Sequence, residues 1–204
     1  MNSFLIDPSP ILSFWFDDGL DHGWPTRNMQ PIWFGGGAAL DAEIRERFQA
    51  PTELAMRGEL VEWQEQPLSR LALIILLDQF SRNIWRGQAQ AFAGDHRAVT
   101  LVCEGISRGM DRHLPWVGRV FFYMPLMHAE DLDLQDLCVD CFQRIVDSAP
   151  QAIAEKVQGN LEFAIEHRDI IARFGRFPYR NAVLGRENSA EEDAWLEDGK
   201  RYGQ

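Results

Sequence analysis

Lysine is nearly absent from this chain, which has two lysines and eighteen arginines among 204 residues. An excess of acidic residues leaves a formal net charge of −11, which repels nucleic-acid phosphates and anionic lipid surfaces. We therefore expect neither nucleic acid nor a membrane as a partner. A GC-rich genome is the simplest explanation for arginine in place of lysine. Arginine also provides bidentate recognition of carboxylate and phosphate groups.

Cysteine is scarce too, with only Cys103, Cys138 and Cys141. An odd number of cysteines argues against a disulfide framework, and the Cys138-x-x-Cys141 spacing inside a helical pattern favours two core thiols. The N-terminal region has no basic segment ahead of its short apolar run, unlike a signal peptide. The apolar run over residues 71–77 is too short to span a bilayer. Together these features predict a cytoplasmic protein.

Strand-like alternation is also missing, whereas apolar residues recur at helical spacing along the chain. The composition, 46% hydrophobic and 25% charged, suits one globular domain over residues 1–204. Short connections between successive helices favour antiparallel helical hairpins. We predict an all-α fold with helices over residues 8–17, 38–58, 67–85, 88–110, 113–128, 131–148 and 150–174, then a short helix near 178–185 and a last one from 189.

Prolines and glycines divide this helical pattern. Residues 19–37 carry several of both and are expected to form an irregular loop, although their aromatic side chains must pack on something. Pro51 is expected to break or restart its helix, and Pro125 to kink or end its helix just ahead of His128. Ser189 and Glu192 have the spacing of a capping box.

The most apolar helix, nearly all apolar over residues 71–77, is expected to be central and buried. A first group of polar residues extends it: Asp78, Gln79, Arg82 and Asn83. Asp78 and Arg82 are four residues apart, so they share a helix face, and Gln79 and Asn83 repeat this spacing. A buried carboxylate is costly unless it is paired. Two interpretations stay open: a structural Asp78–Arg82 pair that locks two helices, or an Asp78 that orients or deprotonates a ligand.

A second group lies where the proline-containing apolar helix ends. His128 is followed closely by Glu130 and Asp131. Such groups serve as general acids and bases or as metal ligands, but one of the acids can equally cap the next helix. Neither an HExxH motif nor a Glu-x-x-His pair occurs. We therefore keep His128 as a candidate site residue and predict no metal ion and no cofactor.

A third group combines His167 with five arginines between residues 168 and 186. His167 falls on the apolar face of its helix, where a histidine is more often a core residue than a ligand. Asp169 and Arg173 can form an ordinary helix pair. Several arginines beside a helix end and a new helix start make a favourable anion site. In an acidic chain, this local surplus predicts a carboxylate or phosphate ligand.

Resemblance to a known family rests on three segments: LLDQFSRNIWRG, YMPLMHAED and FAIEHRDIIARFGRFPYRNAVLGRE. They resemble the bacterial family catalogued as domain of unknown function 924, and the resemblance runs from about residue 11 to residue 195. It implies an all-α fold similar to tetratricopeptide-repeat superhelices and brings no assigned reaction. It also draws attention to the polar residues named above.

Three functional hypotheses follow. The first is a small-molecule enzyme or binding protein with a pocket walled by Trp33, Phe34 and Trp85, which holds a small anionic ligand. The second is a tetratricopeptide-like module that binds a protein or peptide in an exposed groove. The third is a metalloenzyme that uses His128, Glu130 and His167. The oligomeric state is not indicated by the sequence.

We favour the first hypothesis because the polar residues lie within apolar helices rather than on exposed faces. The candidate catalytic residues are Asp78, His128 and His167. The candidate ligand-binding residues are Gln79, Arg82, Asn83, Arg173, Arg176, Arg180 and Asn181.

Overall fold

Helices are the only regular elements within residues 7–198, the part of the chain that this computed structural model describes. The all-α prediction is therefore confirmed, while the tetratricopeptide-like superhelix stays a prediction. The single domain predicted over residues 1–204 includes residues 1–6 and 199–204, which lie outside the described residues. Among the described helices, none is both long enough and apolar enough to cross a bilayer.

The described part of the chain consists of α-helices joined by short 3₁₀ turns, and a single π-helical segment interrupts them there. The α-helices are α1 (Ser9–Phe16), α2 (Gly19–His22), α3 (Gln30–Trp33), α4 (Ala38–Met56), α5 (Pro67–Ile74), α6 (Ser81–Ile84), α7 (Asp95–Ser107), α8 (Trp116–Met127), α9 (Leu132–Ser148), α10 (Ala154–Phe174) and α11 (Ala190–Asp198). The 3₁₀ turns are η2 (Val61–Gln64), η4 (Ala89–Phe92), η5 (Met110–His113), η6 (Gln151–Ile153) and η7 (Pro178–Arg180), and η3 (Ile75–Phe80) is π-helical.

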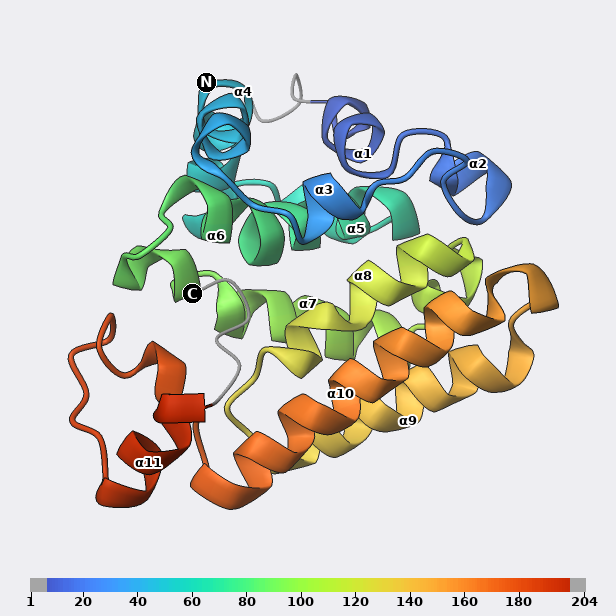
Figure 1. Cartoon of the computed structure of the whole chain (residues 1–204). Coiled ribbons are helices and arrows are strands. Elements are labelled where there is room, and N and C mark those ends of the chain that lie inside the picture. Colours follow the sequence, from blue (N-terminus) through green and yellow to red (C-terminus); the bar gives the residue numbers. More distant parts are fainter. Residues whose placement is uncertain (1–6, 199–204) are drawn as a thin grey trace.

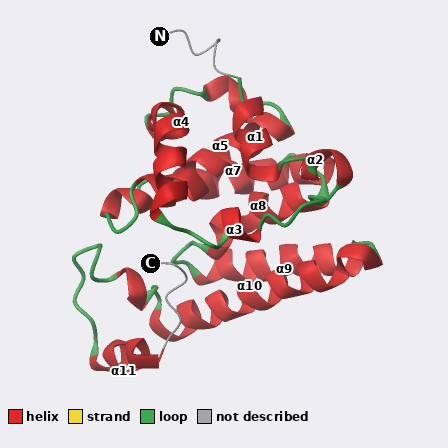
Figure 2. Cartoon of the chain, turned by 45° about the horizontal axis from the view of Figure 1, so that its top comes forward, coloured by secondary structure: helices red, strands yellow, loops and turns green. Residues whose placement is uncertain are grey.

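Two halves of the chain face each other across the core. Helices α1 to α6 lie above α7 to α10 in the view of Figure 1, where α9 and α10 form a long antiparallel hairpin. Helix α8 packs on α9, and α7 packs on both α5 and α8. The segment that carries α11 lies at one end of the α9–α10 hairpin, as the turned view in Figure 2 also shows.

The central helix is formed by α5, η3 and α6 in succession. Every side chain of residues 71–77 is fully buried, which confirms the burial predicted from its apolar sequence. This helix contacts α4 on one side and α7 and α8 on the other. Burying a leucine or isoleucine side chain contributes about 1.5–3 kcal/mol to folding. This run is therefore a major part of the core and fixes the position of the polar residues that follow it.

Two predictions about chain breakers are corrected. Residues 19–37 are not wholly irregular, because they contain α2 and α3, and the indole of Trp33 donates to the Trp15 carbonyl at 2.7 Å. Pro51 lies inside α4 without breaking it. Phe48 and Ala55, which flank this proline, are buried against the core, so their packing offsets the backbone hydrogen bond that proline removes.

Other predictions about helix ends are confirmed. Helix α8 contains Pro125 and ends at Met127, just ahead of His128. The capping box of α11 forms as predicted, because the Ser189 N–H donates to Glu192 and the Glu192 N–H donates to the Ser189 hydroxyl.

Helices α7 and α8 approach each other closely at Gly105. A Cβ atom added to Gly105 would lie 2.5 Å from Cζ of Phe122 and 3.2 Å from Cδ of Arg70. Both of these neighbours are fully buried, so neither side chain has open space into which to move. Glycine is therefore required at this position by the contact between the two helices.

We expect Gly105→Ala to lower the free energy of unfolding by about 1 kcal/mol, because overpacking costs more than the gain in helix propensity. The matched control is Gly159→Ala in α10, where an added Cβ meets nothing within 4 Å. This control should raise the free energy of unfolding by roughly 0.4–1 kcal/mol. Urea denaturation of both variants measures the difference. Equal stabilisation by the two substitutions would contradict the close approach of α7 and α8.

Candidate functional site

Asp78 lies in η3, the π-helical segment in the middle of the central helix. Segments of this kind are rare and are found frequently at functional sites. The side chain of Asp78 is fully buried. A buried carboxylate must be compensated by donors or cations, because its desolvation is costly. The contacts of Asp78 therefore show how the site is built.

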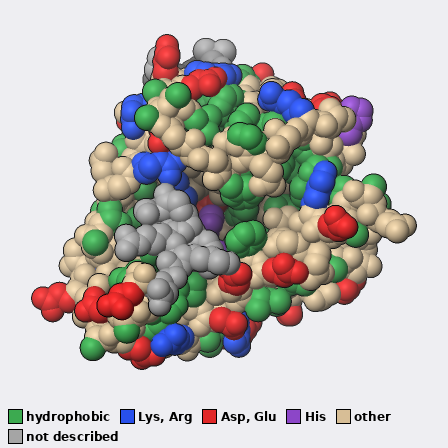
Figure 3. Space-filling view, in the orientation of Figure 1, with side chains coloured by type: hydrophobic (Ala, Val, Ile, Leu, Met, Phe, Trp, Pro, Cys, Tyr) green, Lys and Arg blue, Asp and Glu red, His purple; other side chains and the backbone are tan. Residues whose placement is uncertain are grey.

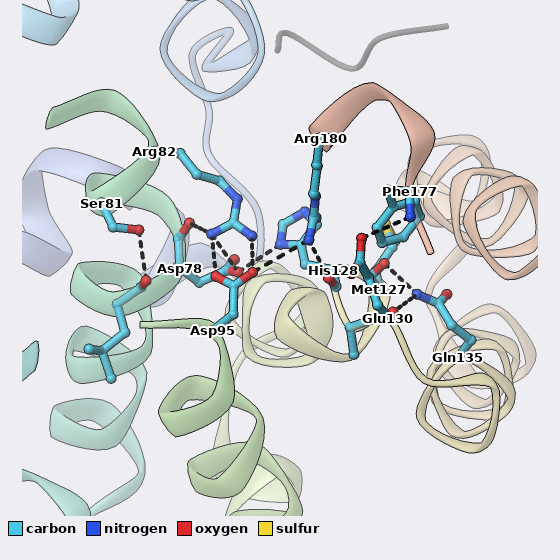
Figure 4. Close-up of polar contacts among 12 residues, drawn as sticks. Asp78, Ser81, Arg82, Asp95, Met127, His128, Glu130, Gln135, Phe177 and Arg180 are labelled. Atoms are coloured by element: carbon cyan, nitrogen blue, oxygen red, sulfur yellow. Dashed lines mark hydrogen bonds and ion pairs between the residues drawn. The ribbon is translucent and has the colours of Figure 1, made fainter. Parts of the chain in front are cut away.

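Three side chains compensate the Asp78 carboxylate. Nδ1 of His128 lies 2.7 Å from Oδ1 of Asp78, and Nη1 of Arg82 lies 3.3 Å from the same oxygen. The amide of Gln79 donates to Oδ2 at 2.6 Å. The predicted Asp78–Arg82 pair is thus present, and it is joined by a histidine fifty residues further along the chain (Figure 4).

The second ring nitrogen of His128, Nε2, lies on the side of the imidazole away from the Asp78 carboxylate. Because an ionised carboxylate only accepts hydrogen bonds, Nδ1 is assigned the proton and Nε2 the lone pair. Among residues 7–198, no group hydrogen-bonds to Nε2 of His128. The His128 side chain is 17% exposed. Figure 3 shows a hollow near the middle of this face with a histidine side chain at its floor and hydrophobic side chains beside it.

Asp95, the first residue of α7, joins two guanidinium groups around His128. Arg82 donates to both carboxylate oxygens of Asp95, each at 3.0 Å. Nη1 of Arg180 lies 3.6 Å from Asp95 and donates to the His128 carbonyl at 3.0 Å. Two carboxylates and two guanidinium groups thus surround one imidazole, as Figure 4 shows.

Arg180 is held between aromatic rings. Its Cζ lies 4.5 Å from the ring centroid of Phe177 and 4.8 Å from that of Phe92, distances at which a cation is attracted to the ring face. Its Nε–H is buried and has no hydrogen-bond partner among the described residues. An unpaired buried donor is costly and rare. Arg180 therefore has donor capacity left for an anionic group.

The pKa shifts of Asp78 and His128 suit general-base catalysis, with His128 as the group that accepts the proton. Burial raises the pKa of Asp78, but His128, Arg82 and Gln79 outweigh burial and hold this pKa well below its usual value. Burial lowers the pKa of His128, and Arg82 and Arg180 lower it further, so that the opposing effect of Asp78 does not restore it. At neutral pH the pair is therefore a carboxylate and a neutral imidazole, the arrangement in which aspartate orients a histidine base.

His167 lies beside this pair but does not contact Asp78. Its ring centroid is 6.4 Å from that of His128 and 5.6 Å from that of Phe177. Nδ1 donates to the Phe163 carbonyl at 2.8 Å. Burial and the neighbouring His128 lower the pKa of His167 to about 4. This favours a neutral packing role for His167 rather than the catalytic role predicted for it.

Asn83 forms a separate cluster. It donates to Asp41 of α4 at 2.8 Å, and Arg86 binds the same carboxylate at 2.7 and 2.9 Å. Asn83 therefore ties α6 to α4 and is not brought together with the Asp78 cluster. Gln79 instead belongs to the site through Asp78 and also contacts the sulfur of Met124 at 3.5 Å.

Three more of the residues predicted to bind a ligand lie outside the Asp78 cluster and hold the C-terminal segment. Arg173 donates to Glu191 at 2.8 Å, and Arg176 binds Glu192 at 2.7 and 2.8 Å. Asn181 donates to Asn188 at 2.8 Å. The two arginines are thus paired with acidic residues in the first turn of α11. Of the arginines predicted to bind an anion, Arg82 and Arg180 are the ones that lie in the cluster.

Sequence reasoning did not find the partners of two acidic residues. Asp95 was not singled out as a site residue, although its place beside Gly94 at a helix start was a visible signal. Glu130 accepts the Phe177 N–H at 2.8 Å and binds Arg186 at 2.6 and 2.9 Å. Glu130 thereby docks the segment that carries Arg180. The alternative in which one acid caps the next helix holds for Asp131, which accepts the Leu134 N–H.

Other regions of the described structure are weaker candidates for a ligand or metal site. An open depression along α4, lined by Arg45, Glu46 and Gln49 among others, contains no buried titratable side chain. Within residues 7–198, no three His, Cys, Asp or Glu side chains converge so as to hold a metal ion. Glu130 faces Arg186 rather than the two imidazoles, so the geometry does not support a shared metal site.

Comparison with known proteins identifies the family. Residues 11–200 match the family described as bacterial protein of unknown function, domain of unknown function 924, and the chain belongs to this family. It is also similar to the solved structure of ATU0120, a protein of unknown function from Agrobacterium tumefaciens. The two are 40% identical over 94% of this chain and 97% of that chain, with a TM-score of 0.78. No curated protein matches.

We expect His167→Gln to remove part of the acid sensitivity of the fold. Because the folded pKa of His167, about 4, lies below the unfolded value of about 6.5, the unfolded state binds more protons between these values. Stability is then lost as pH falls below about 6.5. Between pH 7.5 and pH 5 the loss due to this residue should be about 2 kcal/mol.

Urea unfolding at both pH values checks this expectation. The exposed His96, whose replacement by glutamine leaves the core untouched, provides the control variant. His96→Gln should lose as much stability as the unaltered protein, and His167→Gln about 2 kcal/mol less. If His167→Gln loses as much as His96→Gln, then His167 is not held neutral by burial.

We expect Glu130→Gln to loosen the C-terminal segment without loosening the α9–α10 hairpin. Hydrogen bonds to charged groups contribute about 1.5–3 kcal/mol each, so amide exchange over residues 177–186 should accelerate roughly tenfold or more. Asp136→Asn, which removes the exposed Asp136–Arg168 pair, is the matched control and should leave this exchange unchanged. Unchanged exchange in Glu130→Gln would rule out docking through Glu130.

Proposed function

We propose that this member of the bacterial family of unknown function 924 binds a small anionic molecule beside His128 and removes a proton from it or from a water next to it. The observation that carries the proposal is a pair of polar atoms in this cluster to which no described residue hydrogen-bonds. Nε2 of His128 and Nε of Arg180 both lack partners among the described residues.

Each residue of the cluster has a role in this proposal. Asp78 accepts the Nδ1–H of His128 and so fixes the tautomer in which Nε2 is basic. Nε2 accepts the proton, and Asp78 stabilises the resulting imidazolium. A positioned base of this kind contributes about 10²- to 10⁴-fold to a reaction rate. Arg180 donates to the anionic group of the ligand, while Asp95 positions the guanidinium groups of Arg82 and Arg180.

A covalent mechanism has less support. The hydroxyl of Ser81 donates to the Leu77 carbonyl at 2.7 Å, so it is engaged by its own helix. Burial raises the pKa of Cys138 and of Cys141, which disfavours the reactive thiolate. Proton transfer to His128 therefore fits the site better than attack by a side chain, and the proposal requires no cofactor.

The alternative function, a tetratricopeptide-like module for a protein or peptide partner, is less well supported. Such a groove would spread its polar side chains over an exposed surface, whereas the charged residues around His128 are largely enclosed. A cytoplasmic location remains part of the proposal. It is supported by the three free cysteines, because thiols persist in a reducing compartment.

A thermal-shift screen with carboxylate and phosphorylated metabolites tests the proposal. A ligand at about 100 times its dissociation constant should stabilise the fold by roughly 2.7 kcal/mol, visible as a higher Tm. The shift should be lost in Arg180→Met, which removes the donor and keeps the apolar stem. It should persist in Arg173→Ala, an exposed arginine that pairs with Glu191. A panel without any shift would contradict the proposal, as would equal shifts in both variants.

A further inference from the structure

The ionised groups around His128 balance one another. Asp78 and Asp95 supply two negative charges, and Arg82 and Arg180 supply two positive charges. Their side chains are at most 19% exposed, so solvent screens them weakly. With a neutral imidazole, the cluster carries no net charge before any ligand enters.

The charged and titratable groups that face His128 from the other elements do not change the net charge of the cluster. Glu130 and Arg186 neutralise each other in a bidentate pair. His167 is neutral at pH 7, because burial lowers its pKa to about 4, and burial raises the pKa of Tyr179 to about 12. The remaining polar neighbours, Gln79 and Gln135, carry no charge. Gln135 of α9 is engaged with the carbonyls of Met127 and Ala129.

An anion that enters a neutral, largely buried cluster is itself uncompensated, and such a charge is strongly disfavoured. His128 is the group in this cluster that can supply the missing positive charge. On taking up a proton, its imidazolium has Asp78 on the Nδ1 side and the ligand on the Nε2 side, so that both N–H groups face negative oxygens. Asp78 stands 2.7 Å away, already in place to stabilise that cation.

Resting on the anion binding of the proposed function, we infer that the site binds a singly charged carboxylate together with one proton, which is held on His128, so that in this complex His128 is a proton donor and not a base. One imidazole compensates one negative charge, so a monocarboxylate matches the cluster and a dianion such as phosphate or a dicarboxylate does not. The bound ligand and His128⁺ then form an ion pair next to Arg180. The site thus selects its ligand by charge as well as by shape.

Calorimetric titration of the full-length protein tests this inference. The probes are propionate and benzoate, compared with succinate and inorganic phosphate, each in buffers of different ionisation heat near pH 7.5. The slope of binding heat against buffer ionisation heat gives the number of protons taken up. We expect one proton per bound monocarboxylate and weaker binding of both dianions. Affinity for the monocarboxylate should fall about tenfold per pH unit above the pKa of the imidazole.

His128→Gln should abolish the proton uptake and flatten the pH dependence, with His96→Gln as the matched control. Should His128→Gln fail to fold, the imidazole carbon resonances of the unaltered protein give the same answer. The signal of His128 should move to its protonated position on addition of benzoate. Monocarboxylate binding without proton uptake overturns the inference and leaves the proposed function intact. If no carboxylate or phosphate compound binds, both are overturned.

Discussion

The fully buried carboxylate of Asp78 is the constraint on which the arrangement of this protein depends. It lies in the most apolar helix of the chain, where an unpaired charge would oppose folding. Arg82 and Gln79 from the same helix and His128 from the end of α8 compensate it. Arg82 in turn requires Asp95, and Asp95 brings in Arg180. Compensation of one charge therefore links the central helix, α7, α8 and the C-terminal segment.

The π-helical segment gives this constraint its geometry. One extra residue in a helix rotates everything beyond it by about 100° relative to a regular α-helix. In η3 the turn carries both Asp78 and Gln79, with Arg82 one turn later. The side chains of Gln79 and Arg82 thereby reach the Asp78 carboxylate, while residues 71–77 remain packed in the core. The central helix thus combines apolar packing with a polar contact by changing from α-helical to π-helical geometry along its length.

Sequence alone was informative where interactions are local. Helical periodicity predicted the all-α fold and the burial of residues 71–77, and the spacing of Asp78 and Arg82 predicted their contact. Ser189 and Glu192 formed the expected cap. Sequence was less informative where a partner lies far along the chain. The arginines at 173 and 176 resembled an anion site until the docking of α11 supplied Glu191 and Glu192. Asp95 was missed because its partners depend on tertiary structure.

The position of Arg180 near the end of the chain also affects how the protein is made. The ribosome delivers Asp78, Arg82 and Asp95 roughly a hundred residues before Arg180, so an unfinished chain has two carboxylates and one guanidinium at this place. The nascent half-site carries an unbalanced negative charge that the segment with Arg180 removes. Synthesis of that segment, rather than formation of the central helix, is therefore the event that makes this interior electrically neutral.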